Sequence, residues 1–347
     1  MGVDPKTQMS RRTFLVVAAA VPLAAQPNVR FGIDLFSIRD QGWGPFEYLD
    51  YCARWKAKVV HFSEIRFIGG LEDEHLKRVR EHAEGLGIQI EIGMRSICPT
   101  STLFDPKQGS AEEQLTRMLH AARVVGSPIV RCVLGSMADR QPPVYIDGHI
   151  RDTVRVLHNI RSRVLDSGLK IAIENHAGDM QARELKSLIE DAGPDFVGAC
   201  LDSGNPLWTI EDPHLTLETL HPYVLTSHVR DSAVWRVPEG AAVQWVRMGE
   251  GNVGIDDYVR KYATLCPGRA LSLEVIVTQP RVFAFHQPKF WDAYRHDPAW
   301  EFERFLALAE RGTPRPPSPP LSKSEAVERQ REDLEASIRY AHKLLNL

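Results

Sequence analysis

The segment Leu169–His176, LKIAIENH, constrains this chain most, because an apolar run ends there in Glu174, Asn175 and His176. A segment that is apolar on both faces and then turns polar is typical of a buried parallel strand that carries functional side chains at its C-terminal end. The same form recurs three times: Asp202 follows Val197–Leu201, His228 follows Val224–Ser227, and Glu274 lies late in Ala270–Ile276. We therefore expect four strands, each with a metal-type ligand near its end.

The spacing of these residues predicts that the four strands are consecutive. Glu174, Asp202 and His228 are separated by 28 and 26 residues, and each interval fits one strand followed by one helix. The interval from His228 to Glu274 is 46 residues, which fits one such unit plus an insertion. We expect the insertion to be a loop over Asp231–Gly254, a Gly-containing and poorly periodic stretch. In a (β/α)₈ barrel all four side chains project into the mouth at the C-terminal face, where active sites of this fold lie.

Strand-like and helix-like segments alternate from Arg30 onward, which favours a parallel sheet. The expected strands are Phe31–Leu35, Lys58–Phe62, Ile88–Ile92, Ile129–Leu134, Lys170–Ile173, Val197–Leu201, Tyr223–Ser227 and Leu271–Ile276. The clearest helical patterns are Pro45–Ala57, Asp73–Leu86, Ala111–Val125, Ile150–Ser167 and Ala182–Asp191, with Gly85, Gly126 and Gly168 as expected C-terminal caps. Eight strands favour an α/β fold closed into a (β/α)₈ TIM barrel over an open doubly wound sheet. No strand runs into GEGNVG at Gly249–Gly254, so this motif does not predict a dinucleotide site.

Both ends of the chain lie outside the barrel pattern. Met9–Gln26 combines paired arginines, an apolar stretch too short to span a bilayer, and small residues, which is the layout of an export signal. We expect residues 1–26 to be a signal peptide cleaved after Ala25, which leaves no integral membrane span; the alternative is a disordered or membrane-anchoring N-terminus. Residues 30–312 are expected to form the barrel, 313–321 a Pro-rich linker, and 322–347 a charged amphipathic helix docked on the barrel or on a second copy.

Gln279–Trp300 is rich in aromatic residues and histidine and follows the eighth strand on the expected catalytic side. We expect it to cover the mouth; alternatively its rings cap the barrel or pack against a neighbouring subunit, and the sequence leaves room for a homo-oligomer. The net charge of −3 gives no basic footprint for nucleic acid, so the expected partner is a small molecule. The five cysteines stand singly without Cys-x-x-Cys spacing and predict neither a zinc site nor a disulfide framework.

A divalent metal follows from the chemistry of the four strand-end residues. Three carboxylates that converge on one point repel one another and raise one another's pKa unless a cation lies between them. We therefore expect one ion at Glu174, Asp202, His228 and Glu274. An oxygen-rich set with one imidazole suits Mn²⁺ best, with Mg²⁺, Co²⁺ and Zn²⁺ as alternatives. The competing interpretation is that these are ordinary polar residues that make loop hydrogen bonds.

Five further residues are candidates for binding a substrate. His176, two residues past Glu174, points to the same side of an extended segment, so it would bind a substrate hydroxyl or orient Glu174. Asn205 and Arg230 follow two of the ligands and are expected to contact substrate oxygens, with solvated loop residues as the alternative. Glu64 and Arg95 end the second and third strands and are expected to face the same mouth.

The motifs IENHAGD, CLDSGN, SHVRD, GEGNVGID and LSLEV resemble those of the xylose isomerase-like TIM-barrel superfamily, a group of sugar isomerases and epimerases. The resemblance covers about Arg30–Gly312 and implies a carbohydrate substrate and the metal set Glu174, Asp202, His228 and Glu274. Arg230 stands where this family more often has lysine. Ser10–Leu15, SRRTFL, resembles the twin-arginine signal, which implies export of the folded protein to the periplasm.

The expected activity is isomerisation or epimerisation of a sugar or polyol through an enediolate, with Glu174 and Glu274 transferring protons. A lyase or hydratase acting on a 3-keto-sugar or keto-inositol would use the same metal and bases. An endonuclease IV-like phosphodiesterase is disfavoured, because Val243–Trp245 occupies the place of the D-x-H that its three-zinc site needs and Asn205 stands where it has a histidine. The remaining alternative is a noncatalytic exported sugar-binding protein.

Overall fold

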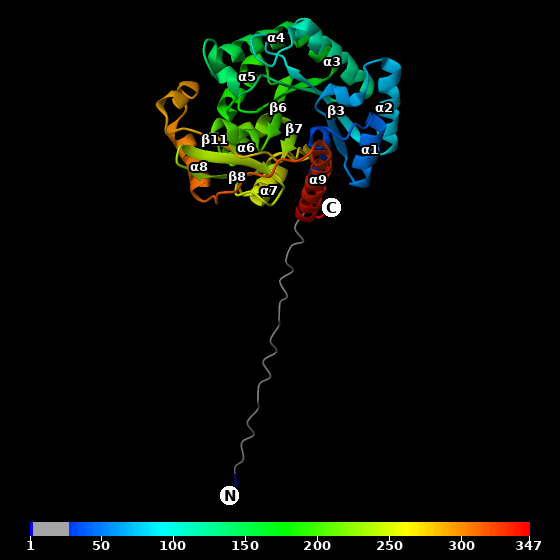
Figure 1. Cartoon of the computed structure of the whole chain (residues 1–347). Coiled ribbons are helices and arrows are strands. Elements are labelled where there is room, and N and C mark those ends of the chain that lie inside the picture. Colours follow the sequence, from blue (N-terminus) through cyan, green and yellow to red (C-terminus); the bar gives the residue numbers. More distant parts are fainter. Residues whose placement is uncertain (3–27) are drawn as a thin grey trace.

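The computed structural model describes residues 1–2 and 28–347, so the expected export signal lies outside the described residues. Eight parallel strands close into a barrel in the order β1-β10-β7-β6-β5-β4-β3-β2 (Figure 1). The strands are β1 (Arg30–Asp34), β2 (Val59–Phe62), β3 (Gln89–Ser96), β4 (Ile129–Val133), β5 (Lys170–Glu174), β6 (Val197–Asp202), β7 (Val224–Val229) and β10 (Ala270–Leu273). The predicted (β/α)₈ TIM barrel is confirmed, and each strand overlaps one of the eight expected segments.

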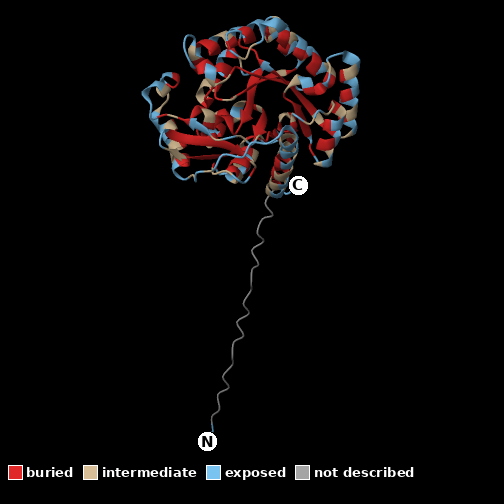
Figure 2. Ribbon diagram, viewed as in Figure 1, coloured by how far each residue is buried: buried red, intermediate tan, exposed pale blue. Residues whose placement is uncertain are grey.

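The strands are apolar on both faces because both faces are buried. In β2, Val59, Val60 and Phe62 are completely shielded from solvent, and Figure 2 shows the strands as a buried ring inside helices whose outer faces are exposed. One side of each strand faces the barrel interior and the other packs against the helices, so the alternation of apolar and polar residues typical of half-exposed strands is missing. This is why each strand reads as a short continuous apolar run.

Seven helices follow the first seven barrel strands: α1 (Pro45–Arg54), α2 (Asp73–Gly85), α3 (Ala111–Val125), α4 (Tyr145–Ser167), α5 (Ala182–Ala192), α6 (Pro213–Leu220) and α7 (Ile255–Leu265). Gly126 and Gly168 end α3 and α4 in the left-handed conformation, as expected. The prediction for Gly85 is wrong: it is the last residue of α2, and the glycine with positive φ is Gly87, at +68°. The start of α4 lies earlier than expected, because polar residues interrupt the apolar periodicity of its first turns.

The prediction of a loop over Asp231–Gly254 is wrong. The segment forms an antiparallel hairpin of β8 (Asp231–Val237) and β9 (Gly240–Val246), and β11 (Arg281–Phe283) pairs with β9 to complete a three-stranded sheet. Each strand contains two valines and a tryptophan, and Pro238 to Gly240 supply turn residues between the strands. Such a pattern is a hairpin signal. It was masked because both faces of the hairpin are largely buried, so polar and apolar residues do not alternate.

A second apolar core lies beside the barrel, between this sheet and α8 (Ala299–Glu310). Val234 and Val243 of the hairpin pack there with Phe305 and Leu308 of α8. The aromatic residues of the segment Gln279–Trp300 that belong to this core are Phe283, Phe285, Phe290, Trp291 and Tyr294. These rings therefore join the insertion after β7 to the segment after β10.

The C-terminal helix α9 (Lys323–Leu345) packs on the barrel, one of the two placements expected for it. Leu334 and Ile338 are fully shielded and belong to the main core. The helix contacts the first and seventh units, because the Tyr51 hydroxyl donates to Glu335 at 3.3 Å and the Tyr340 hydroxyl donates to Asp256 at 2.5 Å. In Figure 1, α9 lies between α1 and α7, where the eighth helix of a (β/α)₈ barrel belongs.

The five cysteines are free and buried, as their isolated spacing predicts. Among the residues that the structure describes, no helix combines the length and apolar character that crossing a membrane requires.

Candidate metal centre

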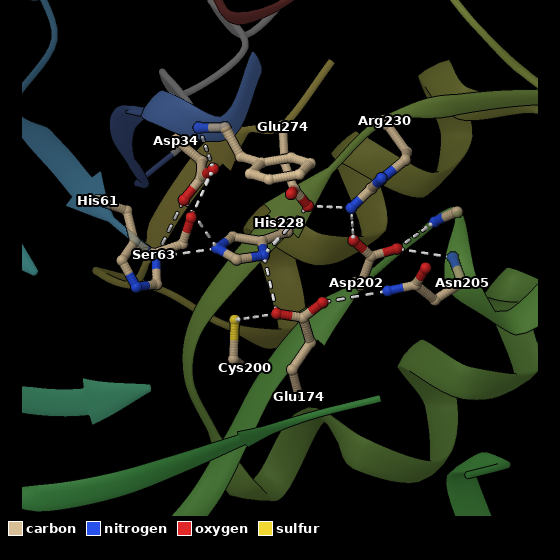
Figure 3. Close-up of polar contacts among 12 residues, drawn as sticks. Asp34, His61, Ser63, Glu174, Cys200, Asp202, Asn205, His228, Arg230 and Glu274 are labelled. Carbon is tan, nitrogen blue, oxygen red and sulfur yellow. Dashed lines mark hydrogen bonds and ion pairs between the residues drawn. The ribbon is translucent and has the colours of Figure 1, made fainter. Parts of the chain in front are cut away.

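The structure brings the four predicted ligands together at the C-terminal end of the barrel (Figure 3). Glu174 ends β5, Asp202 ends β6, His228 lies near the end of β7, and Glu274 directly follows β10. One ligand atom from each side chain lies within 4.8 Å of the others, and all four side chains are buried. The parallel register explains this convergence, because Asp202 pairs with His228 and β10 pairs with β7 next to Glu274.

The imidazole of His228 faces two of the carboxylates. Its Nδ1 lies 3.0 Å from Glu174 Oε2 and 3.3 Å from Glu274 Oε2, yet within the described residues this buried nitrogen has no hydrogen-bond partner. Its Nε2 lies 2.9 Å from Nδ1 of His61 and 3.4 Å from Oδ2 of Asp34. The ring is thus held from behind and presents Nδ1 to the carboxylates, which is how metal-binding histidines are usually oriented.

The charges at the site fit a divalent ion. Burial raises the pKa of Glu174, but Arg131 and His228 outweigh burial and hold it well below its usual value. Burial also raises the pKa of Asp202, to about 6, although Arg230 opposes the shift. Burial lowers the pKa of His228, but Cys200, Glu174 and Glu274 outweigh burial and raise it well above its ordinary value. The carboxylates therefore attract a positive charge onto His228, and a divalent ion bound to neutral Nδ1 would supply that charge instead.

Two arginines, Arg131 and Arg230, offset part of the negative charge of the carboxylates in the cluster. The Nε of Arg131, on β4, donates to Glu174 Oε2 at 2.6 Å, and its Nη1 donates to the Met94 carbonyl at 3.3 Å. Arg230, expected to contact substrate oxygens, donates through Nη2 to both Asp202 and Glu274. Sequence reasoning missed Arg131, although a lone arginine in the apolar run of β4 was a usable signal.

Asp34 and His61, at or near the ends of β1 and β2, are two further buried residues that sequence reasoning missed. Asp34 accepts hydrogen bonds from the Phe36 backbone at 2.8 Å and the Ser63 hydroxyl at 3.0 Å, and burial raises its pKa to about 7. A single polar residue that interrupts or ends an apolar strand is the form that identified Glu174. The same search applied to the first two strands would have found both.

Asn205 lies within the cluster, where it orients two ligands. Its side-chain amide donates to Glu174 Oε1 at 3.1 Å, and its backbone N–H donates to Asp202 Oδ1 at 2.7 Å. His176 lies at the rim of the cluster, where its Nδ1 is 2.8 Å from the Gly135 carbonyl oxygen. Burial lowers the pKa of His176, although Glu174 opposes the shift.

Glu64 and Arg95 do not join the cluster. In the described part of the chain, no hydrogen bond or ion pair connects either residue to the four ligands. Glu64 pairs with Arg66 at 2.5 Å, and both Glu64 and Arg95 line a separate cavity of about 360 Å³ beside the loops that follow β2 and β3.

Comparison with known proteins identifies the family of this barrel. The family described as "Xylose isomerase-like TIM barrel" matches residues 49–293, more than half of the chain. A curated relative, 3-oxo-isoapionate decarboxylase of Pectobacterium atrosepticum, is 24% identical over 188 residues, which cover 54% of this chain and 61% of the relative. The match thus spans less than two thirds of that enzyme's length. The uncharacterized protein YihM of Escherichia coli K12 is 27% identical over 270 residues, with coverages of 75% and 71%.

Two solved structures share the fold. The IOLI protein with a bound zinc atom has a TM-score of 0.59 and 12% identity, over 91% of this chain and 98% of that one. D-Psicose 3-epimerase crystallised in the presence of D-fructose has a TM-score of 0.59 and 15% identity, over 91% of this chain and 99% of the epimerase. Both similarities concern the barrel as a whole.

Proposed function

Because the chain belongs to the xylose isomerase-like TIM barrel family, we propose that it is a divalent-metal-dependent enzyme that isomerises or epimerises a sugar or polyol through an enediolate. The observation that carries this proposal is the position of the buried Nδ1 of His228, 3.0 Å from Glu174 Oε2 and 3.3 Å from Glu274 Oε2. A buried imidazole nitrogen surrounded by carboxylates is a donor set that suits one divalent ion. Mn²⁺ fits this oxygen-rich set best, and the zinc atom of IOLI shows that a protein of this fold can hold a related ion.

A divalent ion held by Glu174, Asp202, His228 and Glu274 supplies Lewis-acid stabilisation of the negative charge that develops on the substrate oxygens. The two glutamates reach the centre from β5 and from the end of β10, on either side of His228. One glutamate would remove the carbon-bound proton, and the other would return a proton to the opposite face. The low pKa of Glu174 keeps it ionised at neutral pH, as removal of a proton requires.

Neighbouring side chains orient these groups and contact the substrate. Asn205 fixes Glu174 Oε1 by its amide hydrogen bond, which limits the directions that this carboxylate can face. We propose that His176, at the rim, binds a substrate hydroxyl and that Arg230 contacts a substrate oxygen when a sugar is bound. We assign Glu64 and Arg95 at most a contact with a distant part of a substrate, because they line the neighbouring cavity.

A lyase acting on a 3-keto-sugar or keto-inositol is the second candidate, and the match to 3-oxo-isoapionate decarboxylase favours it. Removal of a proton from the carbon next to the ketone would give an enolate that expels a hydroxyl group from the following carbon, and loss of CO₂ from the carbon next to the ketone would leave the same kind of enolate. The same metal and glutamates could therefore serve in either reaction. An endonuclease IV-like phosphodiesterase does not fit, because Trp245 is packed between other side chains where a further metal ligand would be needed.

A turnover assay across substrate classes tests the proposal. The protein is stripped of metal, reloaded with Mn²⁺, and incubated with ketoses, keto-inositols and 3-keto-glycosides, and products are identified by NMR. We expect conversion of a ketose to its epimer or isomer by the reloaded protein alone. Product only from a 3-keto substrate would favour the lyase, and binding without turnover in any class would identify a sugar-binding protein.

A further inference from the structure

Arg230 is held in the cluster by a stack of planar side chains. Its guanidinium carbon lies 4.4 Å from the ring centroid of Trp245, which stacks on Trp208 at a centroid distance of 4.3 Å and an interplanar angle of 11°. Arg281 lies over the Trp208 ring at 4.2 Å. The indole N–H of Trp245 donates to the Gly204 carbonyl at 3.1 Å, so the ring on which Arg230 rests is fixed by a hydrogen bond as well as by stacking.

Gly204 makes room for this arrangement. A Cβ atom added at this position would lie 2.5 Å from both Cγ and Cδ of Arg230 and 3.1 Å from Nε1 of Trp245. The φ angle of Gly204 is −95°, which any residue can adopt, so the glycine is required for space and not for its backbone conformation. The aliphatic part of Arg230 therefore packs directly against Gly204 between the end of β7 and the carboxylates.

The guanidinium of Arg230 donates hydrogen bonds to two of the four proposed metal ligands. Its Nη2 donates to Asp202 Oδ2 and to Glu274 Oε2, and its buried Nε has no partner in the described part of the chain (Figure 3). Arg131 differs, since it contacts Glu174 alone among the ligands and is also tied to the Met94 carbonyl. Of these two arginines, Arg230 is the one that bridges two ligands, and its position depends on Trp245 of the hairpin β8–β9.

We propose that Arg230 competes with the metal ion for the carboxylates of Asp202 and Glu274. Before the metal binds, Arg230 holds these two carboxylates together, and once the metal is bound, Arg230 weakens its binding. Trp245 and Gly204 are the residues that position Arg230. This inference rests on the metal of the proposed function. A fixed cation beside a divalent ion repels it and shares its ligand oxygens, so metal affinity depends on how firmly Arg230 is held there. Contact with an indole face and its packing hold a guanidinium in this way.

Isothermal titration calorimetry of the metal-stripped full chain with Mn²⁺ measures the Mn²⁺ affinity and tests the proposal. Arg230→Met removes the competitor and should tighten Mn²⁺ binding by roughly tenfold or more. Trp245→Leu and Gly204→Ala change no charge but release or displace Arg230, so both should tighten Mn²⁺ binding in the same direction. Trp245→Phe keeps an aromatic face and should bind Mn²⁺ with near wild-type affinity. If Trp245→Leu or Gly204→Ala acted only by destabilising the hairpin β8–β9, the variant would bind Mn²⁺ more weakly than wild type.

Trp235→Leu is the matched control. Trp235 is a buried tryptophan on β8 of the same hairpin, on the face opposite to Trp245 because side chains alternate along paired strands. This variant should leave Mn²⁺ affinity unchanged. In an Arg230→Met background, Trp245→Leu should cause no further change, because its whole effect passes through Arg230.

The outcomes separate this inference from the proposed function. If wild type binds Mn²⁺ and the folded Trp245→Leu and Gly204→Ala proteins bind it no more tightly, the inference is wrong while the metal site stands. If Trp245→Leu fails to fold, the Mn²⁺ affinity of Gly204→Ala alone tests the inference. Binding by Arg230→Met but not by wild type would support the competitor and show that Arg230 excludes the metal. If neither binds Mn²⁺, both the metal site and the inference fail.

Discussion

Glu174 makes polar contacts through both of its carboxylate oxygens, and its neighbours account for its chemistry. Its Oε2 accepts from Arg131 and lies 3.0 Å from His228 Nδ1, while its Oε1 accepts from the Asn205 amide. Both carboxylate oxygens are therefore fixed in direction. Because Arg131 and His228 hold the pKa of Glu174 low, the carboxylate stays charged despite its burial.

Glu174→Gln and Glu274→Gln should each lower kcat/KM by about 10²–10⁴-fold, the usual contribution of a positioned acid or base. Each variant should also exchange protons with solvent on at most one face of the substrate, which NMR in D₂O measures. Glu218→Gln, at a partly exposed ion pair on α6, serves as the control. Near wild-type turnover by either glutamine variant with metal bound would show that the residue is only a ligand.

Glu211 gives a pH-dependent contribution to stability that is separate from the metal centre. It accepts hydrogen bonds from the Ala182 backbone at the start of α5 and from the Thr216 hydroxyl, yet burial raises its pKa to about 8, above the ordinary 4.5. The folded state thus holds this proton more tightly than the unfolded chain does. The resulting stabilisation is complete below pH 4.5 and is lost as the pH rises through about 8.

Glu211→Gln should therefore flatten the dependence of Tm on pH between 4.5 and 8, because glutamine keeps a polar side chain but cannot ionise. Thermal unfolding at a series of pH values measures this slope, with Glu218→Gln as the reference for a partly exposed carboxylate. Parallel curves for wild type and Glu211→Gln would contradict the assignment.

At the residue scale, the convergence of the four proposed ligands was predictable, because they follow apolar strands at regular spacing. Their partners from the first half of the chain were not predicted, although Asp34, His61 and Arg131 are polar residues in or at the end of apolar strands. His61 and His228 touch although 167 residues separate them, and such a contact depends on barrel closure rather than on any local pattern. Arg131 interrupts the apolar run of β4, but the pairing of β4 with β5 is what identifies Glu174 as its partner.

Among the elements, the hairpin β8–β9 links the barrel to the second core. Its β9 strand carries Trp245 toward Arg230, while Val234 and Val243 pack against α8. The sequence predicted an insertion of about this length after His228 but not its form, because burial on both faces removed the alternation by which strands are usually recognised. The residues on either side of Gly240 nevertheless carried a hairpin signal.

The helix α9 should contribute strongly to the stability of the barrel. Ile338→Ala and Leu334→Ala remove fully buried side chains from the main core, so each should lower the free energy of unfolding by about 2–5 kcal/mol. Lys343→Ala, at an exposed position of the same helix, should change it by less than about 0.5 kcal/mol. Urea denaturation compares the three variants. Small and equal effects would mean that α9 is only loosely attached.

For the whole molecule, the sequence predicted the architecture well because a (β/α)₈ barrel repeats one local pattern eight times. Strands such as β5 and β6 are recognisable by composition alone, and right-handed crossovers then leave few ways to arrange them. How the ends attach was less predictable. The placement of α9 between α1 and α7 depends on contacts such as Tyr51 with Glu335, which pair residues from opposite ends of the chain.

Export is a prediction that concerns residues outside the described structure. We expect the twin-arginine route to carry the protein to the periplasm, since Arg11 and Arg12 precede a short apolar stretch. Replacing both arginines with lysine keeps the charge and should retain the protein in the cytoplasm, which cell fractionation and immunoblotting measure. Unchanged export of the double variant would contradict this interpretation of residues 1–26.

Deuterium incorporation into a ketose during metal reloading tests the central claim, one divalent metal centre that supports proton transfer at carbon. The stripped protein is titrated with Mn²⁺ in D₂O in the presence of a ketose panel, and exchange beside the carbonyl is followed by NMR. We predict that exchange is absent without metal, rises in proportion to added Mn²⁺, and reaches a plateau at one ion per chain. Exchange by the metal-free protein, or a plateau that requires three ions per chain, would contradict a single centre at Glu174, Asp202, His228 and Glu274.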